Sequence, residues 1–114
     1  MWSIDRTEEI AEWIRGMDDD AKEAIFKSLL ILQEIGPSLG RPHVDSIKES
    51  RHKNMKKLRI QNRQRLFRIL FAFDTDRKAI LLVGGDKRGD KRFYQKMMPL
   101  ADSLFDKHLA KWRK

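Results

Sequence analysis

Residues 55–83 contain three consecutive β-strand patterns with no helical pattern between them, and this grouping strongly restricts the possible folds. The segment 55–61 alternates polar and apolar residues, whereas 65–73 and 78–83 are rich in aromatic and aliphatic residues, as buried strands are. Consecutive strands joined by short turns favour an antiparallel meander, while doubly wound folds alternate strands with helices. The sequence therefore predicts an α+β fold.

Helical patterns flank this sheet. An extended segment around Ile4 comes first, and apolar residues then recur at helical spacing after Thr7 and again after Asp18, both suitable N-caps. Gly36 is expected to end the second helix, and Pro99 to kink or split a C-terminal helix. The predicted order is an N-terminal helical hairpin, an antiparallel sheet of three to four strands, and a C-terminal helix.

The charge of the chain is divided unevenly. Lys and Arg number 25 against 17 Asp and Glu, a formal net charge of +8. Residues 1–47 hold 5 basic and 10 acidic residues (net −5), and residues 48–114 hold 20 and 7 (net +13). Clustered Lys and Arg bind polyanions because they displace counterions from phosphates. This division predicts nucleic-acid contact through the second part, mainly residues 48–96.

Several classes of protein are excluded by composition. A chain of 114 residues is expected to form a single domain over residues 1–114. The sequence has no Cys, which excludes a disulfide scaffold, a thiolate zinc site and a cysteine nucleophile. The three histidines lack metal-ligand spacing, so no metal and no other cofactor is expected. Without an apolar run of ~20 residues or a signal peptide, a cytoplasmic location is expected.

Several blocks in order resemble the phage-derived, HigB-like branch of the RelE/ParE toxin superfamily, which belongs to type II toxin–antitoxin systems. The blocks are residues 50–59, 67–74, 79–87, 92–94 and 99–102, followed by His108-Leu109. The likeness spans residues 36–110, and the helical hairpin fits in topology only. It implies a small α+β toxin that enters the ribosomal A site and cuts exposed mRNA. It also implies a cognate antitoxin with a helix-turn-helix domain.

RNA cleavage without metal requires a base for the ribose 2′-OH, cations for the phosphorane charge and an acid for the leaving 5′-oxygen. Lys57 and Arg59 are expected on one face of a strand, where both can point at a phosphate, with Lys56 as a further RNA-binding candidate. The resemblance implies that Lys57 is the base or an electrostatic activator and that Arg59 clamps a phosphate. The alternative is a solvated sheet face.

Arg68 interrupts an otherwise apolar strand. A buried Arg without a partner is costly, so this side chain is expected either to pair with an acid or to open onto a cleft. The resemblance favours the cleft, with Arg68 stabilising the phosphorane. Arg65 would take that place if the hairpin register were shifted, and it is otherwise an RNA-binding candidate.

The loop after the last strand supplies Lys87 and Arg88, and Arg92 precedes the C-terminal helix. Arg88 stands six residues before Tyr94, the spacing at which RelE-type toxins place an Arg before a Tyr. The resemblance implies that Tyr94, the only tyrosine, stacks on the scissile base or protonates the leaving oxygen. Arg88 is accordingly a catalytic candidate, and Lys87 and Arg92 are RNA-binding candidates. The alternative for Tyr94 is helix packing.

Other residues have less specific interpretations. His52 is expected on the surface and His108 in the C-terminal apolar stripe, and Gly84-Gly85 are expected to form a tight turn. Two rival functions fit the same composition. One is a ParE-like inhibitor of DNA gyrase without nuclease activity, and the other is a catalytically inactive basic module that binds nucleic acid.

Overall fold

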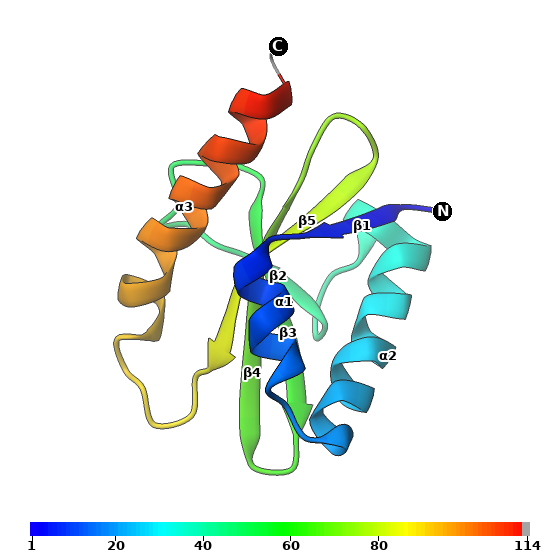
Figure 1. Cartoon of the computed structure of the whole chain (residues 1–114), viewed down its shortest axis with the longest axis vertical. Helices are drawn as coiled ribbons and strands as arrows, with labels where there is room; N and C mark the ends of the chain where they lie inside the picture. The colour runs from blue at the N-terminus through cyan, green and yellow to red at the C-terminus, as the bar shows by residue number, and fades with distance from the viewer. Residues whose placement is uncertain (113–114) are drawn as a thin grey trace.

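The computed structural model describes residues 1–112, and side chains through Lys111. Its sheet has five strands in the order β1-β5-β4-β3-β2 (Figure 1). The strands are β1 (Ser3–Arg6), β2 (Val44–Ser46), β3 (Met55–Asn62), β4 (Arg65–Phe73) and β5 (Lys78–Asp86). The helices are α1 (Glu8–Arg15), α2 (Asp19–Ile35), the short 3-10 helix η1 (Gly36–Ser38) and α3 (Phe93–Trp112). No helix in the described part of the chain is long and apolar enough to cross a membrane.

The structure confirms the α+β class and adds one strand to the expected three to four. Strands β2 to β5 pair antiparallel, as the meander predicts. The additional strand is β1, which lies parallel to the outer side of β5, with Ile4 beside Ala79. The segment around Ile4 is only four residues long, so its pattern could not show where it pairs.

The helices cover both faces of the sheet (Figure 1). On one face α1 packs over β5 and α2 over β3, and buried Phe67, Ile69 and Phe71 of β4 fill the space beneath them. On the opposite face α3 packs over β4 and β5, where Leu70 and Leu82 form part of a second buried cluster. The site described below lies on this α3 face.

The helix ends follow the predicted chemistry. The Thr7 hydroxyl oxygen accepts a hydrogen bond from the backbone N–H of Ile10 at 3.2 Å. The Asp18 carboxylate accepts one from the N–H of Ala21 at 2.8 Å. Gly36 ends α2 with φ of 72°, a left-handed conformation that Gly adopts at little cost. These three predicted caps are confirmed.

The tight turn expected at Gly84-Gly85 is wrong, because β5 continues to Asp86 instead of ending at Val83. The two glycines make room for aromatic rings on opposite faces. A Cβ on Gly84 would lie 2.6 Å from Cζ3 of Trp13, and one on Gly85 would lie 2.9 Å from Cε1 of Phe93.

The expected split of the last helix at Pro99 is also wrong, because α3 is continuous through this residue. Met98 and Ala101 on either side of Pro99 are buried against the sheet. Packing on both sides of the proline therefore favours one continuous helix despite the missing backbone N–H.

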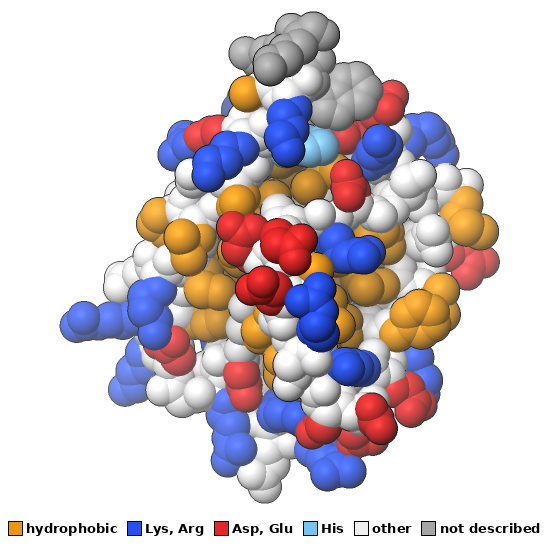
Figure 2. Space-filling model, viewed as in Figure 1, with side chains coloured by type: hydrophobic (Ala, Val, Ile, Leu, Met, Phe, Trp, Pro, Cys, Tyr) orange, Lys and Arg blue, Asp and Glu red, His pale blue; other side chains and the backbone are white. Residues whose placement is uncertain are grey.

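The two unlike charge regions are visible on the surface. Acidic side chains gather over α1 in Figure 2, whereas basic side chains project at the lower left edge, towards the β5–α3 loop. That loop and the β3–β4 turn lie at the same end of the molecule (Figure 1). The N–H of Lys87 joins them by donating to the carbonyl of Leu66 at 2.8 Å.

Candidate functional site

Lys57, Arg59 and Arg68 lie on one face of the sheet, the face that α3 partly covers. Met55 of β3 and Leu70 of β4 belong to the buried cluster on the α3 side. Side chains alternate along a strand, so Lys57 and Arg59 share the face of Met55, and Arg68 shares that of Leu70. In the β3–β4 register Arg59 stands directly opposite Arg68. Like charges in this position destabilise a sheet, so the pair is suited to an anion.

Arg68 is buried without an acidic partner. Arg68 is only 6% exposed to solvent. Nη1 donates to the carbonyl oxygen of Phe67 at 2.9 Å, while the buried Nε has no hydrogen-bond partner in the described chain. Burying an unpaired charged group costs free energy, and an anion bound on this face would offset that cost.

Tyr94, in the first turn of α3, lies beside two lysines. Nζ of Lys57 is 4.6 Å from the centroid of the tyrosine ring, and Nζ of Lys87 is 5.7 Å from it. Phe93 contacts the same ring edge-on at a centroid distance of 5.2 Å. The Tyr94 hydroxyl is buried and has no hydrogen-bond partner among the described residues. Tyr94 therefore places a hydroxyl that is free to donate a hydrogen bond close to Lys57 and Lys87.

We call Lys57, Arg59, Arg68 and Lys87 the cation cluster. Within the described residues none of the four forms an ion pair with Asp or Glu. The cross-strand neighbour of Lys57 is Asp45, which is already bonded to Arg41 at 2.8 Å. Arg41, followed by the Ser46 N–H and Lys57, holds the pKa of Asp45 below its usual range. The cluster thus keeps its positive charge available for a ligand.

Two of the predicted RNA-binding residues, Lys56 and Arg65, lie on the opposite face of the sheet from the cluster. Arg65 donates to the carboxylate of Asp18 at 2.9 Å and to the side chain of Asn62. The hydrogen bond from Arg65 lowers the pKa of the Asp18 carboxyl below its usual range. Arg65 thereby links the β3–β4 turn to the N-terminus of α2.

Arg88 and Arg92 lie in the loop between β5 and α3, and both are exposed. Their backbone N–H groups donate at 3.0 Å to the carboxylates of Asp86 and Asp90, which shape the loop. Neither guanidinium forms an ion pair in the described structure. Both arginines belong to the same loop as Lys87 of the cation cluster, and their roles stay predictions.

The histidines contact α3 and its neighbours. His52 Nε2 lies 2.7 Å from Asp106 of α3, and His108 Nε2 lies 3.1 Å from Asp74 of the β4–β5 turn. His52 is therefore half-buried and paired, rather than free on the surface as expected. His108 was expected to have its polar atoms paired at the rim of the core, and its contact with Asp74 confirms this. Among the described residues no group of three or more His, Asp or Glu side chains could hold a metal ion.

The sequence interpretation missed a groove beside Tyr94. Its volume is about 460 Å³, and it lies between α3 and the β2–β3 loop, with Glu49 and Gln95 among its lining residues. Asp102 and Asp106 are spaced i, i+4 on α3, so both face the β2–β3 loop. That spacing was the one signal in the sequence that this loop docks on the helix.

A second hollow, of about 570 Å³, lies between β1, the start of α1 and the C-terminal half of α3. Glu8 and Glu9 contribute carboxylates, and Lys107 and Lys111 contribute ammonium groups. None of the predicted site residues lines it. Its mixed charge is less suited to a polyanion than the cation cluster is.

Comparisons with known proteins identify the family of this chain. The family model "Phage derived protein Gp49-like (DUF891)" matches residues 12–106. Two Mycobacterium tuberculosis proteins named as toxins are similar: HigB2 is 43% identical over 97% of this chain, and HigB3 is 42% identical over 90%. The chain spans 56% of the length of HigB2 and 89% of that of HigB3.

Solved structures resemble the fold. An E. coli RelE toxin mutant in the free state superposes with a TM-score of 0.60 at 13% identity, covering 90% of this chain and 95% of that one. RelE in the archaeal RelE–RelB complex of Pyrococcus horikoshii gives 0.58 at 8% identity, covering 77% and 97%. The chain belongs to the Gp49-like family of phage-derived proteins, it is similar to proteins named as HigB toxins, and its fold is that of RelE.

Proposed function

We propose that this protein is the toxin of a type II toxin–antitoxin system and that it cuts mRNA on the ribosome. The observation that carries the proposal is the cation cluster: Lys57 and Lys87 lie beside Tyr94, Arg59 and Arg68 stand opposite each other on the same face of the sheet, and none of the four has an acidic partner among the described residues, although Arg68 is buried. An unpaired buried guanidinium is maintained at a cost to stability, which is expected where the group serves a ligand. RNA phosphate supplies the missing negative charge.

The reaction is an attack of the ribose 2′-oxygen on the adjacent phosphorus, which forms a 2′,3′-cyclic phosphate as the bond to the 5′-oxygen breaks. Lys57 acts on the 2′-OH, as a base or through its charge. Arg59 holds the phosphate, and Arg68 stabilises the extra charge of the phosphorane. Tyr94, whose hydroxyl has no other partner, protonates the leaving 5′-oxygen. Lys87 and the exposed Arg88 and Arg92 attract the RNA backbone.

The partners follow from the same proposal. A cognate antitoxin, expected to carry a helix-turn-helix domain, holds the toxin inactive. An antitoxin partner is supported by the solved complex of RelE, which shares this fold, with RelB. The other partners are the ribosome and its bound mRNA, which places the protein in the cytoplasm. The chemistry assigned to the cluster uses Lys, Arg and Tyr only, without metal or other cofactor.

The test is controlled expression in bacteria, with growth followed and mRNA ends mapped by primer extension. The native protein should stop growth and produce new 5′ ends within translated mRNA. Lys57→Ala, Arg68→Ala and Tyr94→Ala should each relieve the arrest and remove the new ends. Arg15→Ala is the matched control, since Arg15 is an exposed arginine on α1, which packs on the other face of the sheet, and it should behave as native.

Each alternative result has a distinct meaning. Growth arrest with intact mRNA and double-strand DNA breaks would establish a gyrase inhibitor in place of a nuclease. RNA binding without growth arrest would leave only a basic binding module.

A further inference from the structure

The groove beside Tyr94 has the form of a small-molecule site. Its volume of about 460 Å³ is within the ~300–1,000 Å³ common for ligand pockets. Tyr94, Met98 and Pro99 provide an apolar wall on α3. Tyr94 also contacts Lys57 of the cation cluster, so the groove adjoins the proposed position of the scissile phosphate. A nucleotide next to that phosphate could place its base in the groove.

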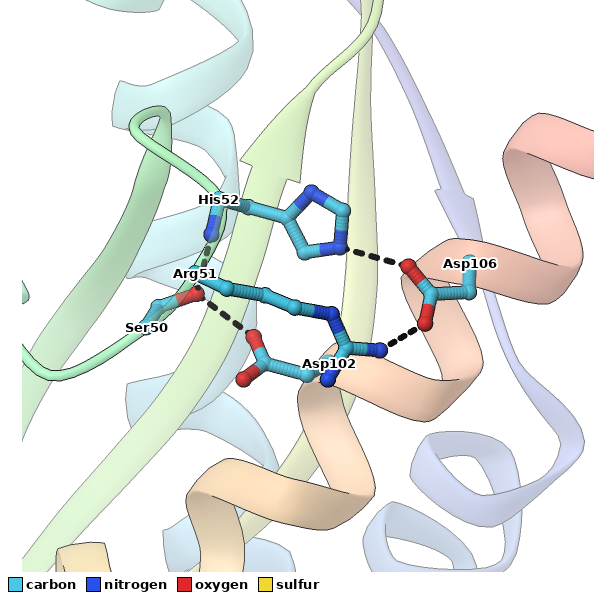
Figure 3. A network of polar contacts seen from close by, with 5 residues as sticks. All are labelled: Ser50, Arg51, His52, Asp102 and Asp106. Carbon is cyan, nitrogen blue, oxygen red and sulfur yellow. Dashed lines mark hydrogen bonds and ion pairs between the residues drawn. The ribbon is translucent and has the colours of Figure 1, made fainter.

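The opposite wall is fixed by a polar network, which Figure 3 shows. The Ser50 hydroxyl donates to Asp102 at 2.5 Å and accepts from the N–H of His52 at 3.0 Å. Arg51 and His52 both contact the carboxylate of Asp106. The β2–β3 loop is thereby tied to α3 at three side chains, and the groove is formed before any ligand binds. The charges of Arg51 and Asp102 are already engaged in this network.

Besides Tyr94, whose hydroxyl is unpartnered but buried, Glu49 and Gln95 are lining residues whose polar groups remain free among the described residues. Neither side chain makes a hydrogen bond or ion pair in the described structure, and both are exposed to the groove and to solvent. Glu49 is also the only acidic residue between positions 46 and 73. A carboxylate repels RNA phosphate, so Glu49 weakens non-specific binding. It contributes to binding only where it accepts hydrogen bonds from the N–H groups of a base.

We propose that this groove binds the base next to the scissile phosphate and that Glu49 selects guanine; the inference rests on the proposed nuclease function. Guanine presents two adjacent N–H donors, N1–H and the exocyclic amine, which match the two oxygens of one carboxylate. The Gln95 amide donates to the guanine O6. Tyr94, Met98 and Pro99 contact the apolar face of the ring. Uracil has one such donor, N3–H, between two carbonyl oxygens. A carboxylate binds this edge poorly because its second oxygen would face a carbonyl oxygen.

The first test maps cleavage in a translated reporter library that has all four bases at each position near the cuts. The native protein should cut preferentially beside guanine, and Glu49→Gln should reduce that preference about tenfold, the lower part of the range for a bidentate contact. Glu34→Gln is the control, because Glu34 is an exposed carboxylate on α2 that forms no ion pair with any described residue. It should keep the native base preference.

The second test measures binding of 2′-O-methyl RNA trinucleotides, which lack the attacking hydroxyl, with guanine, adenine, cytosine or uracil at one position. Tighter binding of the guanine oligonucleotide, lost in Glu49→Gln and kept in Glu34→Gln, supports the proposal whether or not the protein cleaves RNA. Equal affinity for all four, or a base preference unchanged by Glu49→Gln, overturns it. If mRNA is cut without a guanine preference, the groove assignment fails while the nuclease function stands.

Discussion

Arg68 is a residue whose position lowers the stability of the fold, a cost that the proposed binding site would explain. Its burial without an acidic partner, opposite Arg59, is unfavourable in the free protein. The sequence could predict this conflict, since a single Arg within an apolar strand must pair or face a cleft. It could not choose between the two outcomes, because the choice depends on which side chains of α3 and β3 lie above that position.

Arg68→Met should therefore remove the nuclease activity and stabilise the fold. The free energy of unfolding should rise by about 1 kcal/mol, at the low end of the cost of a buried unsatisfied polar group. Urea denaturation measures the change. Ile69→Ala in the same strand is the contrast, since it deletes a fully buried side chain and should cost about 2–5 kcal/mol. A marked loss of stability in Arg68→Met would mean that the guanidinium is satisfied in the free protein.

At the scale of elements, alternation predicted the faces of β3 and β4 correctly, because one buried face fixes the register of a strand. The end of β5 was not predicted. Gly84-Gly85 resembles a turn in sequence, and only the rings of Trp13 and Phe93 explain why a strand continues through it. Trp13 comes from α1, far from β5 in the sequence, and Phe93 opens α3 beyond a loop, eight residues after Gly85, so the pattern of β5 itself contains no sign of either ring.

The two glycines provide a matched pair of variants. Gly84→Ala and Gly85→Ala should each destabilise the fold by about 1–3 kcal/mol, the usual cost of overpacking. Gly85→Ala should also reduce RNA cleavage, because its Cβ would displace Phe93, which contacts Tyr94. Gly84→Ala displaces Trp13 on the other face and should cleave normally. Thermal denaturation gives the stabilities, and cleavage assays well below both midpoints separate the two effects. Equal activities would show that Phe93 does not position Tyr94.

At the scale of the whole molecule, the site is assembled from four segments. Lys57 and Arg59 come from β3, Arg68 from β4, Lys87 from the loop after β5, and Tyr94 from α3. The sequence predicted that the second part of the chain is basic. Which cations converge depends on the packing of α3 across the sheet. Strand alternation puts Lys56 and Arg65 on the opposite face, although they are only one and three positions from Lys57 and Arg68.

Under the proposed function, this convergence predicts how RNA binding depends on salt. Four cluster cations that each neutralise one phosphate contribute about −3 to the slope of log K against log salt concentration, since each contact on a single strand contributes about −0.7. Fluorescence anisotropy with a 2′-O-methyl RNA strand measures the slope without cleavage. Arg59→Ala should reduce its magnitude by about 0.7, whereas Arg15→Ala, on α1, should not change it. If instead the slope followed the net charge of the chain, both variants would reduce it equally, because each removes one positive charge. Unequal slopes would therefore show that RNA is bound by the convergent cluster and not by the overall charge of +8.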